Sequence, residues 1–188
     1  MHGREAIRKK LVYSAFGPTQ KNRLLHDDGD LMSFHFLDPE AFLAFRPGDF
    51  TFAMIKPDGH AHHRKDILAM IKERGFHIER IQEVKLTQTD VEILYYHHLD
   101  KHHFATNAAF ITSGPVTIMM LCGVDIVNEW RAMMGAIDSA KAHGDTIRGR
   151  FGNKTVLNQN VVHGADSPLA AFREAMYFFG KQRNSEAI

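Results

Sequence analysis

One histidine stands in a sequence context that could support nucleophilic chemistry. His163 lies in the stretch NQNVVHGADS, between two valines and a glycine, and an Asp-Ser-Pro run follows it. The valines indicate the end of a strand, and the glycine with the Asp-Ser-Pro run indicates a turn into a helix. Glu174 follows about three helical turns later. If that helix folds back beside the strand, the carboxylate could accept a hydrogen bond from the imidazole and fix its tautomer, as in an activated nucleophile. Taken alone, His163 could instead be a packed histidine and Glu174 a solvated carboxylate.

Cationic and polar side chains at other turns could surround this histidine. Lys56 ends an apolar stretch, Arg131 lies in NEWRAMMG and Arg148 lies in GDTIRGRFG. Asn160 precedes the histidine, and Tyr95 belongs to a helical pattern. Phosphoryl transfer needs little beyond cations on the transferred group and a positioned nucleophile. One lysine and two arginines around a histidine would supply both, although each cation taken singly could be ordinary surface charge.

Strands and helices that could position these residues alternate along the chain from residue 50. The periodicities predict, in order, a strand over DFTFAMI, a helix over 63–75, a strand over 76–86, a helix over 87–99, a short helix over 102–111, a buried strand over 115–123, a helix over 125–135, a long polar loop over 136–159, a strand over 160–163 and a helix over 167–179. This order predicts the α/β (α+β) class. We expect a ferredoxin-like split βαβ sandwich, with a four-stranded antiparallel sheet and helices on one face.

Two regions differ in composition. Residues 1–49 are rich in turn formers, charges and aromatic residues, which predicts an N-terminal extension with one or two short strands or a helical turn. This extension could be an oligomer contact. Residues 50–188 then form the catalytic domain, because every candidate residue lies there.

Composition narrows the class of protein. The chain has 23 basic and 22 acidic residues, which gives no argument for a nucleic-acid or membrane partner. Cys122 is the single cysteine, so we expect a reducing compartment and an inert thiol within an apolar strand. No apolar run approaches the roughly 20 residues of a membrane span. The basic N-terminus could be an organelle transit peptide, but Glu5 and its short length favour a cytoplasmic protein.

Histidine is unusually frequent, with 13 residues in 188. Seven of them form two clusters, which are His60, His62 and His63, and then His97, His98, His102 and His103. A metal site and a solvated surface are the two interpretations. Without cysteine partners or an HExxH motif, the sequence favours a solvated surface.

Five blocks of the sequence, taken together, resemble the signature blocks of nucleoside diphosphate kinases. They are FTFAMIKPDG, FITSGPV, WRAMMGA, DTIRGRFG and NVVHGADS, in that order. The resemblance runs from about Thr51 to Phe179, roughly two thirds of the chain. The histidine block is a specific motif, and the Lys-Pro-Asp-Gly block after a strand is nearly as diagnostic. The family has a ferredoxin-like fold, which agrees with the fold predicted above.

The resemblance implies transfer of the γ-phosphate of a nucleoside triphosphate, such as ATP, to a nucleoside diphosphate by a ping-pong mechanism. His163 would carry the phosphoryl group as phosphohistidine, and Glu174 would orient it. Mg²⁺ would bridge the nucleotide phosphates rather than sit in an all-protein cage, with Asp166 near a metal-bound water. The expected partners are nucleoside di- and triphosphates and further copies of the chain, as a hexamer, tetramer or dimer. No membrane and no specific nucleic acid is expected.

The same resemblance assigns nucleotide contacts. Lys56 matches a lysine that contacts the phosphates and the ribose 3′-hydroxyl, and Asn160 matches an asparagine on the ribose. Arg131 and Arg148 match two arginines that hold phosphates. Tyr95 matches a tyrosine near the γ-phosphate and the histidine.

The chain departs from the family pattern at four nucleotide or packing positions. His103 occupies the position of a phenylalanine that stacks on the base, and Ile137 replaces a threonine that contacts the β-phosphate. Ala165 replaces a serine that links the glutamate to the histidine. Gly144 replaces a proline of the hexamer contact, which, with a short tail after Phe179, predicts a smaller assembly. We therefore expect an active but weaker enzyme, with nucleotide binding affected more than the phosphoryl step.

Two alternatives remain at this level. One is a catalytically weakened family member that acts as a scaffold through residues 1–49. The other is RNA binding, because RGRFG at 148–152 partly resembles a motif of RNA-recognition domains that share this sheet topology. The RNA motif fails after its first residues, and the chain is not basic.

Overall fold

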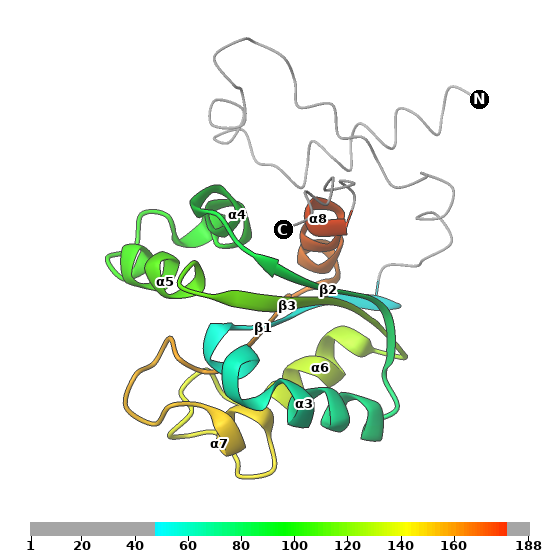
Figure 1. Ribbon diagram of the computed structural model, residues 1–188. Coiled ribbons are helices and arrows are strands. Elements are labelled where there is room, and N and C mark those ends of the chain that lie inside the picture. The colour runs from blue at the N-terminus through cyan, green and yellow to red at the C-terminus, as the bar shows by residue number, and fades with distance from the viewer. Residues whose placement is uncertain (1–47, 180–188) are drawn as a thin grey trace, which may run out of the picture.

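A four-stranded antiparallel sheet forms the centre of the molecule. The computed structural model describes residues 48–179. The strands are ordered β2-β3-β1-β4 (Figure 1). They are β1 (Phe50–Ile55), β2 (His77–Lys85), β3 (Pro115–Cys122) and β4 (Val162–Gly164). This is the predicted ferredoxin-like sheet. The strands or helical turn predicted for the N-terminal extension lie outside the described residues.

Helices cover both faces of this sheet. They are α3 (Pro57–Glu73), α4 (Gln88–Leu94), the 3₁₀ helix η2 (Tyr96–His98), α5 (Phe104–Ile111), α6 (Ile126–Met134), α7 (Ile147–Phe151) and α8 (Pro168–Phe179). In Figure 1, α4, α5 and α8 lie on one side of the sheet and α3, α6 and α7 lie on the other. Over residues 48–179, no helix is long and apolar enough to cross a membrane.

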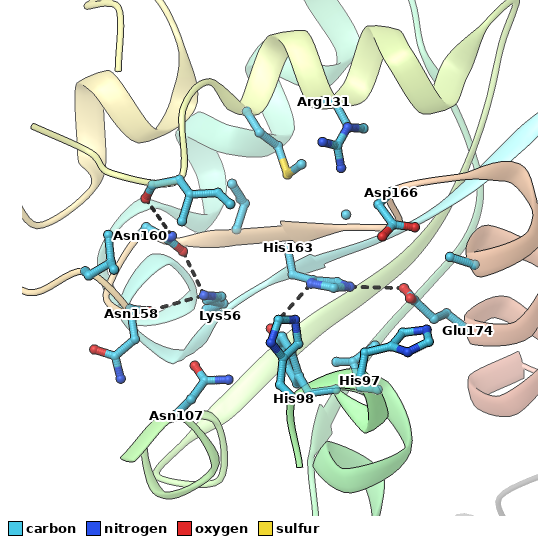
Figure 2. Close-up of a pocket in the computed structure, with 18 of the residues that line it drawn as sticks. Lys56, His97, His98, Asn107, Arg131, Asn158, Asn160, His163, Asp166 and Glu174 are labelled. Atoms are coloured by element: carbon cyan, nitrogen blue, oxygen red, sulfur yellow. Dashed lines mark hydrogen bonds and ion pairs between the residues drawn. The ribbon is translucent and has the colours of Figure 1, made fainter. Parts of the chain in front are cut away.

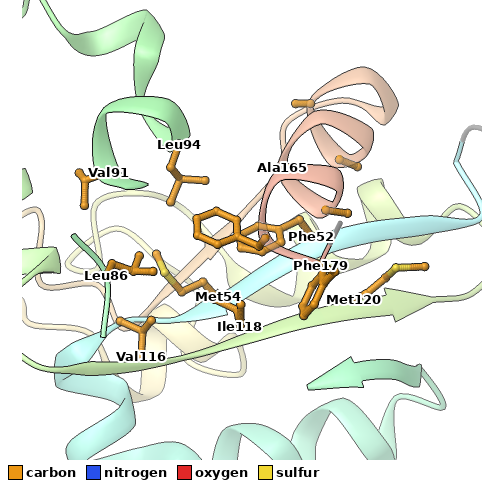
Figure 3. Packing of buried hydrophobic residues seen from close by; sticks show 14 of the residues in the cluster. Phe52, Met54, Leu86, Val91, Leu94, Val116, Ile118, Met120, Ala165 and Phe179 are labelled. Atoms are coloured by element: carbon orange, nitrogen blue, oxygen red, sulfur yellow. The ribbon is translucent and has the colours of Figure 1, made fainter. Parts of the chain in front are cut away.

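The central strand β1 places apolar side chains on both faces of the sheet, so helices on one face alone could not bury them. All six of its residues are buried, and neighbouring side chains point to opposite faces. Phe52 and Met54 join the core under α4 and α8 (Figure 3), whereas Ala53 and Ile55 join the core under α3 and α6. Because each large apolar side chain gains about 1.5–3 kcal/mol from burial, both faces must be covered. The predicted single helical layer is therefore wrong.

Local capping residues set where the first helices begin. The sequence predicts a strand end at Lys-Pro-Asp-Gly, but this block is also the start of α3. Lys56 is the extended N-cap, Pro57 occupies the first turn and Asp58 adds a negative charge there. The helix thus begins well before the predicted residue 63. The predicted cap of α4 is confirmed, since Thr87 and Asp90 form a reciprocal capping box.

The predicted polar loop over 136–159 is partly wrong, because it contains α7. Thr146 caps this helix by accepting a hydrogen bond from the Gly149 amide over 3.1 Å. A helix of 5 residues is too short to show a helical period in the sequence. The last strand is also shorter than predicted and begins at Val162, because Val161 has a left-handed backbone with φ 58°.

Cys122 ends β3 and is half-buried. Burial, with smaller contributions from Glu79 and Asp49, raises the pKa of its thiol to about 11. The thiolate is the reactive form, so this thiol has little reactivity near neutral pH.

Candidate active site

His163 lies on β4 and is held on both sides of its ring. Its Nε2 lies 3.0 Å from Oε2 of Glu174 on α8 (Figure 2). Its Nδ1 lies 3.3 Å from the hydroxyl of Tyr95. A carboxylate only accepts hydrogen bonds, so the ring proton belongs on Nε2. Nδ1 then keeps its lone pair and accepts from Tyr95. This is the tautomer that a nucleophile at Nδ1 requires.

Tyr95 is the C-cap of α4, and its hydroxyl remains a donor over the neutral range. Burial, and next the charge of Glu174, raises the pKa of the Tyr95 phenol far above its ordinary value, while a hydrogen bond with Asn107 acts in the opposite direction. A protonated phenol can donate to Nδ1 in the free enzyme. It can also donate to an oxygen of a group attached there.

The backbone at His163 is fixed by α6. The indole Nε1 of Trp130 donates to the carbonyl oxygen of His163 over 3.3 Å. A Cβ on Gly164 would lie only 2.4 Å from two atoms of the same indole ring. Glycine is therefore the residue that fits after the histidine, and the buried Trp130 sets the distance between β4 and α6.

A strained residue leads into the strand. Val161 is β-branched, yet its φ is 58°, a conformation that costs about 1–3 kcal/mol. Its amide donates to Asp58 over 3.2 Å, and its carbonyl accepts from the Lys56 amide over 2.8 Å. Gly59 leaves room for this carbonyl, because a Cβ there would lie 2.6 Å from it. The start of α3 thus holds the chain that carries His163.

Lys56 is buried beside the histidine strand. Its Nζ donates to Oδ1 of Asn160 over 2.7 Å and to the carbonyl of Asn158 over 3.2 Å. Asn160 in turn donates to the carbonyl of Ile137 over 2.9 Å. Burial, and next the charge of Arg148, lowers the pKa of Lys56 to about 7, with Asp58 opposing. A neighbouring anion would favour the charged lysine.

Two arginines differ in how they are held. Arg148, on α7, is buried and donates to the carbonyls of Gly135 (2.9 Å) and Val162 (3.1 Å). Burial lowers its pKa to about 10, so it stays charged at neutral pH. Its buried Nε has no partner among the described residues. Arg131, on α6, is exposed and lines the same cavity as Arg148.

All the residues predicted for the site line one cavity of about 750 Å³. They come from different helices, strands and loops and are Lys56, Tyr95, His103, Arg131, Ile137, Arg148, Asn160, His163, Asp166 and Glu174. The volume is within the range of small-molecule sites. The tertiary structure therefore gathers the predicted residues in one place.

Three of these residues lie toward the solvent. His103 is the exposed N-cap of α5, and its ring lies 5.8 Å from that of His98. Ile137 is 66% exposed. Asp166 lies in the turn after β4 and accepts a hydrogen bond from the Ser167 hydroxyl over 3.0 Å. They form the rim of the cavity.

Several cavity residues were not predicted from the sequence. Leu157 is an exposed apolar side chain at the rim, and Asn158 offers its carbonyl to Lys56. Arg173 precedes Glu174 and contacts its carboxylate directly. Only the exposed leucine carries a signal in the sequence, because it stands in a polar loop. The other two depend on how α8 and the loop pack.

The histidine clusters do not form a metal cage. Among residues 48–179, no group of three or more His, Cys, Asp or Glu side chains could hold a metal ion. The second cluster lines the cavity rim, whereas His60 bonds to Thr117 over 2.9 Å on the sheet. The RNA alternative also loses its basis, because RGRFG forms α7 rather than a strand that could present aromatic rings to bases.

Comparisons with known proteins agree on one family. The profile of the nucleoside diphosphate kinase family matches residues 49–184. The nucleoside diphosphate kinase of Geobacter sp. (strain M21) is 39% identical over 132 residues, covering 70% of this chain and 95% of that protein. The enzyme of Deinococcus radiodurans is 40% identical over 131 residues, covering 69% and 94%.

Solved structures give the same answer. A halophilic nucleoside diphosphate kinase from Halobacterium salinarum, in complex with CDP, matches with a TM-score of 0.66 and 33% identity, over 71% of this chain and 89% of that one. The enzyme from Encephalitozoon cuniculi matches with a TM-score of 0.67 and 27% identity, over 71% and 90%. Fold and relatives together define a nucleotide-binding phosphotransferase. The chain belongs to the nucleoside diphosphate kinase family.

Proposed function

We propose that the chain passes the γ-phosphate of a nucleoside triphosphate to a nucleoside diphosphate through phosphohistidine at Nδ1 of His163. The observation that carries the proposal is the 3.0 Å contact of Nε2 with Glu174, which leaves Nδ1 as the unprotonated ring nitrogen of a histidine that lines the cavity. Nδ1 forms a bond to the γ-phosphorus as the bond to the β,γ-bridging oxygen breaks, and the diphosphate leaves. A terminal oxygen of a second diphosphate then takes the phosphoryl group, and the N–P bond breaks.

The cations of the cavity stabilise the charge that moves during transfer. Arg148 and Arg131 hold the phosphates, and Lys56 contacts them together with the ribose that Asn160 binds. Burial lowers the pKa of Lys56 to about 7, and the negative charge of bound phosphates beside it would favour the charged lysine. Preorganised cations of this kind supply most of the stabilisation of the transition state in phosphoryl transfer. Tyr95 donates to the phosphoryl group once it is on Nδ1.

The acidic residues of the cavity fit a metal ion that arrives with the nucleotide. Asp166 is an exposed carboxylate at the rim, whereas Glu174 is engaged by His163 and Arg173. One available carboxylate would suit Mg²⁺ that the nucleotide phosphates mainly hold, and Asp166 is the residue that would contact the ion through water. The ion would neutralise phosphate charge, and the nucleophile and its orientation come from the protein.

The departures from the family pattern act on nucleotide binding. His103 offers a smaller ring than phenylalanine for stacking on the base, and Ile137 cannot donate to the β-phosphate. We expect a raised KM for nucleotides and a nearly normal phosphoryl step. A base would stack on the ring of His103 at the rim through its flat face, which every base has. The enzyme should therefore accept a broad range of bases.

Labelling with γ-³²P-ATP tests the proposal. Wild-type protein should gain an acid-labile phosphoryl group and lose it on addition of GDP, and His163→Ala should gain none. His143→Ala is a matched control, since His143 is exposed and does not line the cavity. Absence of label on folded wild-type protein would reject the phosphohistidine mechanism and favour the alternative, a weakened family member that acts as a scaffold through residues 1–49.

The remaining proposals concern the setting of the enzyme. We propose a cytoplasmic homo-oligomer, built from a catalytic domain at 50–188 and an extension at 1–49. Among the described residues, β2 pairs on one side only, with β3, and most of its residues are exposed. Exposed strand edges in soluble proteins are commonly covered or paired, which supports association of copies.

A further inference from the structure

Arg173 contacts the oxygen of Glu174 that the histidine does not use. Its guanidinium NH2 group donates to Oε1 over 3.1 Å, while Oε2 lies 3.0 Å from Nε2 of His163. The two contacts hold the carboxylate from both sides. Ala165, which lies two residues after the histidine, has no polar side-chain atom that could share this task.

Arg173 is itself fixed by its surroundings. Its side chain is 10% exposed, and its guanidinium carbon lies 4.2 Å from the centre of the Tyr96 ring. A cation over an aromatic face at this distance is attracted by the ring quadrupole. Its buried Nε has no partner among residues 48–179, so ring and carboxylate are its main compensation for burial.

We propose that Arg173 is a positioning residue, which locks the Glu174 carboxylate in the orientation that keeps the proton of His163 on Nε2. A carboxylate bonded at one oxygen only can rotate about its last bond and lose the hydrogen bond to the ring. Glu174 is 5% exposed, so little water reaches it to replace a lost partner. This role rests on the proposed function of His163 as phosphoryl carrier. Arg173 would hold Glu174, and Glu174 in turn would hold the imidazole.

A direct contact between Arg173 and the nucleotide phosphates is the competing role, because Arg173 also lines the cavity. The two roles differ in what they require of the donor. A nucleotide contact matters only for donors that carry a nucleotide. A positioning role matters for every donor, because it acts on the nucleophile.

Two phosphoryl donors separate these roles. Phosphoramidate carries its phosphoryl group on ammonia, so attack by Nδ1 forms the N–P bond while ammonia leaves. In Arg173→Gln we expect phosphohistidine formation to slow about 10-fold with both phosphoramidate and ATP, and the KM for ATP to stay within about twofold. Arg173→Lys keeps the charge and should recover part of the rate. Slowing with ATP alone, or with neither donor, would overturn the proposal.

Variants at Tyr96 keep the test independent of how Arg173→Gln folds. Tyr96→Leu removes the ring under the guanidinium and should slow both donors, whereas Tyr96→Phe keeps the ring and should match wild type. Arg74→Gln is the matched control, because it removes an Arg–Glu pair of 2.7 Å on the exposed surface, and it should leave both rates unchanged. Equal rates in Tyr96→Leu and Tyr96→Phe would contradict the role of the ring.

Nitrogen NMR gives a readout that general destabilisation does not move. The ¹⁵N shifts of the His163 ring, assigned by their loss in His163→Ala, should report one tautomer with the proton on Nε2 in wild type and a mixture in Arg173→Gln. An unchanged tautomer would overturn the proposal. Failure of wild-type protein to accept phosphate from either donor rejects the proposed function instead, so the two failures are distinguishable.

Discussion

At the scale of single residues, the candidate site combines a histidine held at both ring nitrogens, the proposed nucleophile, with cations in different states. His163 is held by Glu174 and Tyr95, and Arg148 is locked to backbone carbonyls in the interior. The charge of Lys56 is sensitive to its surroundings near neutral pH, since burial lowers its pKa to about 7. In the ligand-free protein, keeping the buried Lys56 charged therefore costs free energy, and the phosphates of the proposed nucleotide would reduce this cost.

This cost predicts a pH dependence of stability. The unfolded chain holds the Lys56 proton up to its ordinary pKa of 10.5, whereas the folded protein releases it near 7. Between these values the unfolded state binds more protons, so the Lys56 contribution to the free energy of unfolding rises with pH from about 7 to 10.5. Lys56→Met lacks this contribution and should be stabilised relative to wild type more at pH 7 than at pH 10. Urea unfolding at both pH values measures the difference, and a gap independent of pH would contradict it.

At the scale of elements, short segments around β4 place the histidine. The strained Val161 is held by the start of α3, and α6 presses Trp130 against the residue after the histidine. These contacts involve the backbone, so they tolerate little displacement. The position of His163 is thus a property of the packing of α3 and α6 on the sheet.

Two glycines provide a paired test of this packing. Gly164→Ala would put a Cβ 2.4 Å from the Trp130 ring, whereas a Cβ at Gly144 meets nothing within 4 Å. We expect Gly164→Ala to lower the free energy of unfolding by about 1–3 kcal/mol and to slow His163 phosphorylation, because overpacking moves β4. Gly144→Ala should change neither by a measurable amount. Urea denaturation and labelling with γ-³²P-ATP report the two effects, and equal behaviour of the variants would argue against the role of Trp130.

At the scale of the whole molecule, the sheet is covered by helices on both faces and remains open along β2 among the described residues. A partner chain could pair with this edge. Gly144, which replaces the expected proline of the hexamer contact, is exposed and has no described neighbour for an added Cβ within 4 Å.

We therefore predict an oligomer smaller than a hexamer. Light scattering should give a mass of two to four copies of the 21.4 kDa chain, because the strand edge supports pairing while the hexamer contact lacks its proline. A Gly144→Pro variant tests the reason, since it should shift the mass upward if the proline is what is missing. A wild-type mass of six copies would contradict the prediction.

Much of the fold could be predicted from the sequence because it rests on local patterns. Alternation in the strands, the Thr87–Asp90 cap and the glycine after α6 each depend on neighbours in the chain. The short α7 was missed because a helix of 5 residues shows no helical period, and the early start of α3 was missed because Lys-Pro-Asp-Gly is also typical of a turn after a strand. The second layer of helices was not predicted, because a short apolar run such as β1 does not indicate whether one or both of its faces are covered.

The sequence by itself determined which side chains are candidates for the site, because the blocks around Lys56, Arg131 and His163 contain the candidate nucleophile and its cations. Only the tertiary structure decided their states. The tautomer of His163 depends on a glutamate from α8, the pKa of Lys56 depends on burial against Arg148, and the hold on Glu174 depends on Arg173 over a ring from η2. The physical reason is that protonation and orientation respond to distance and solvent exclusion, which neighbours far apart in the chain create only after folding.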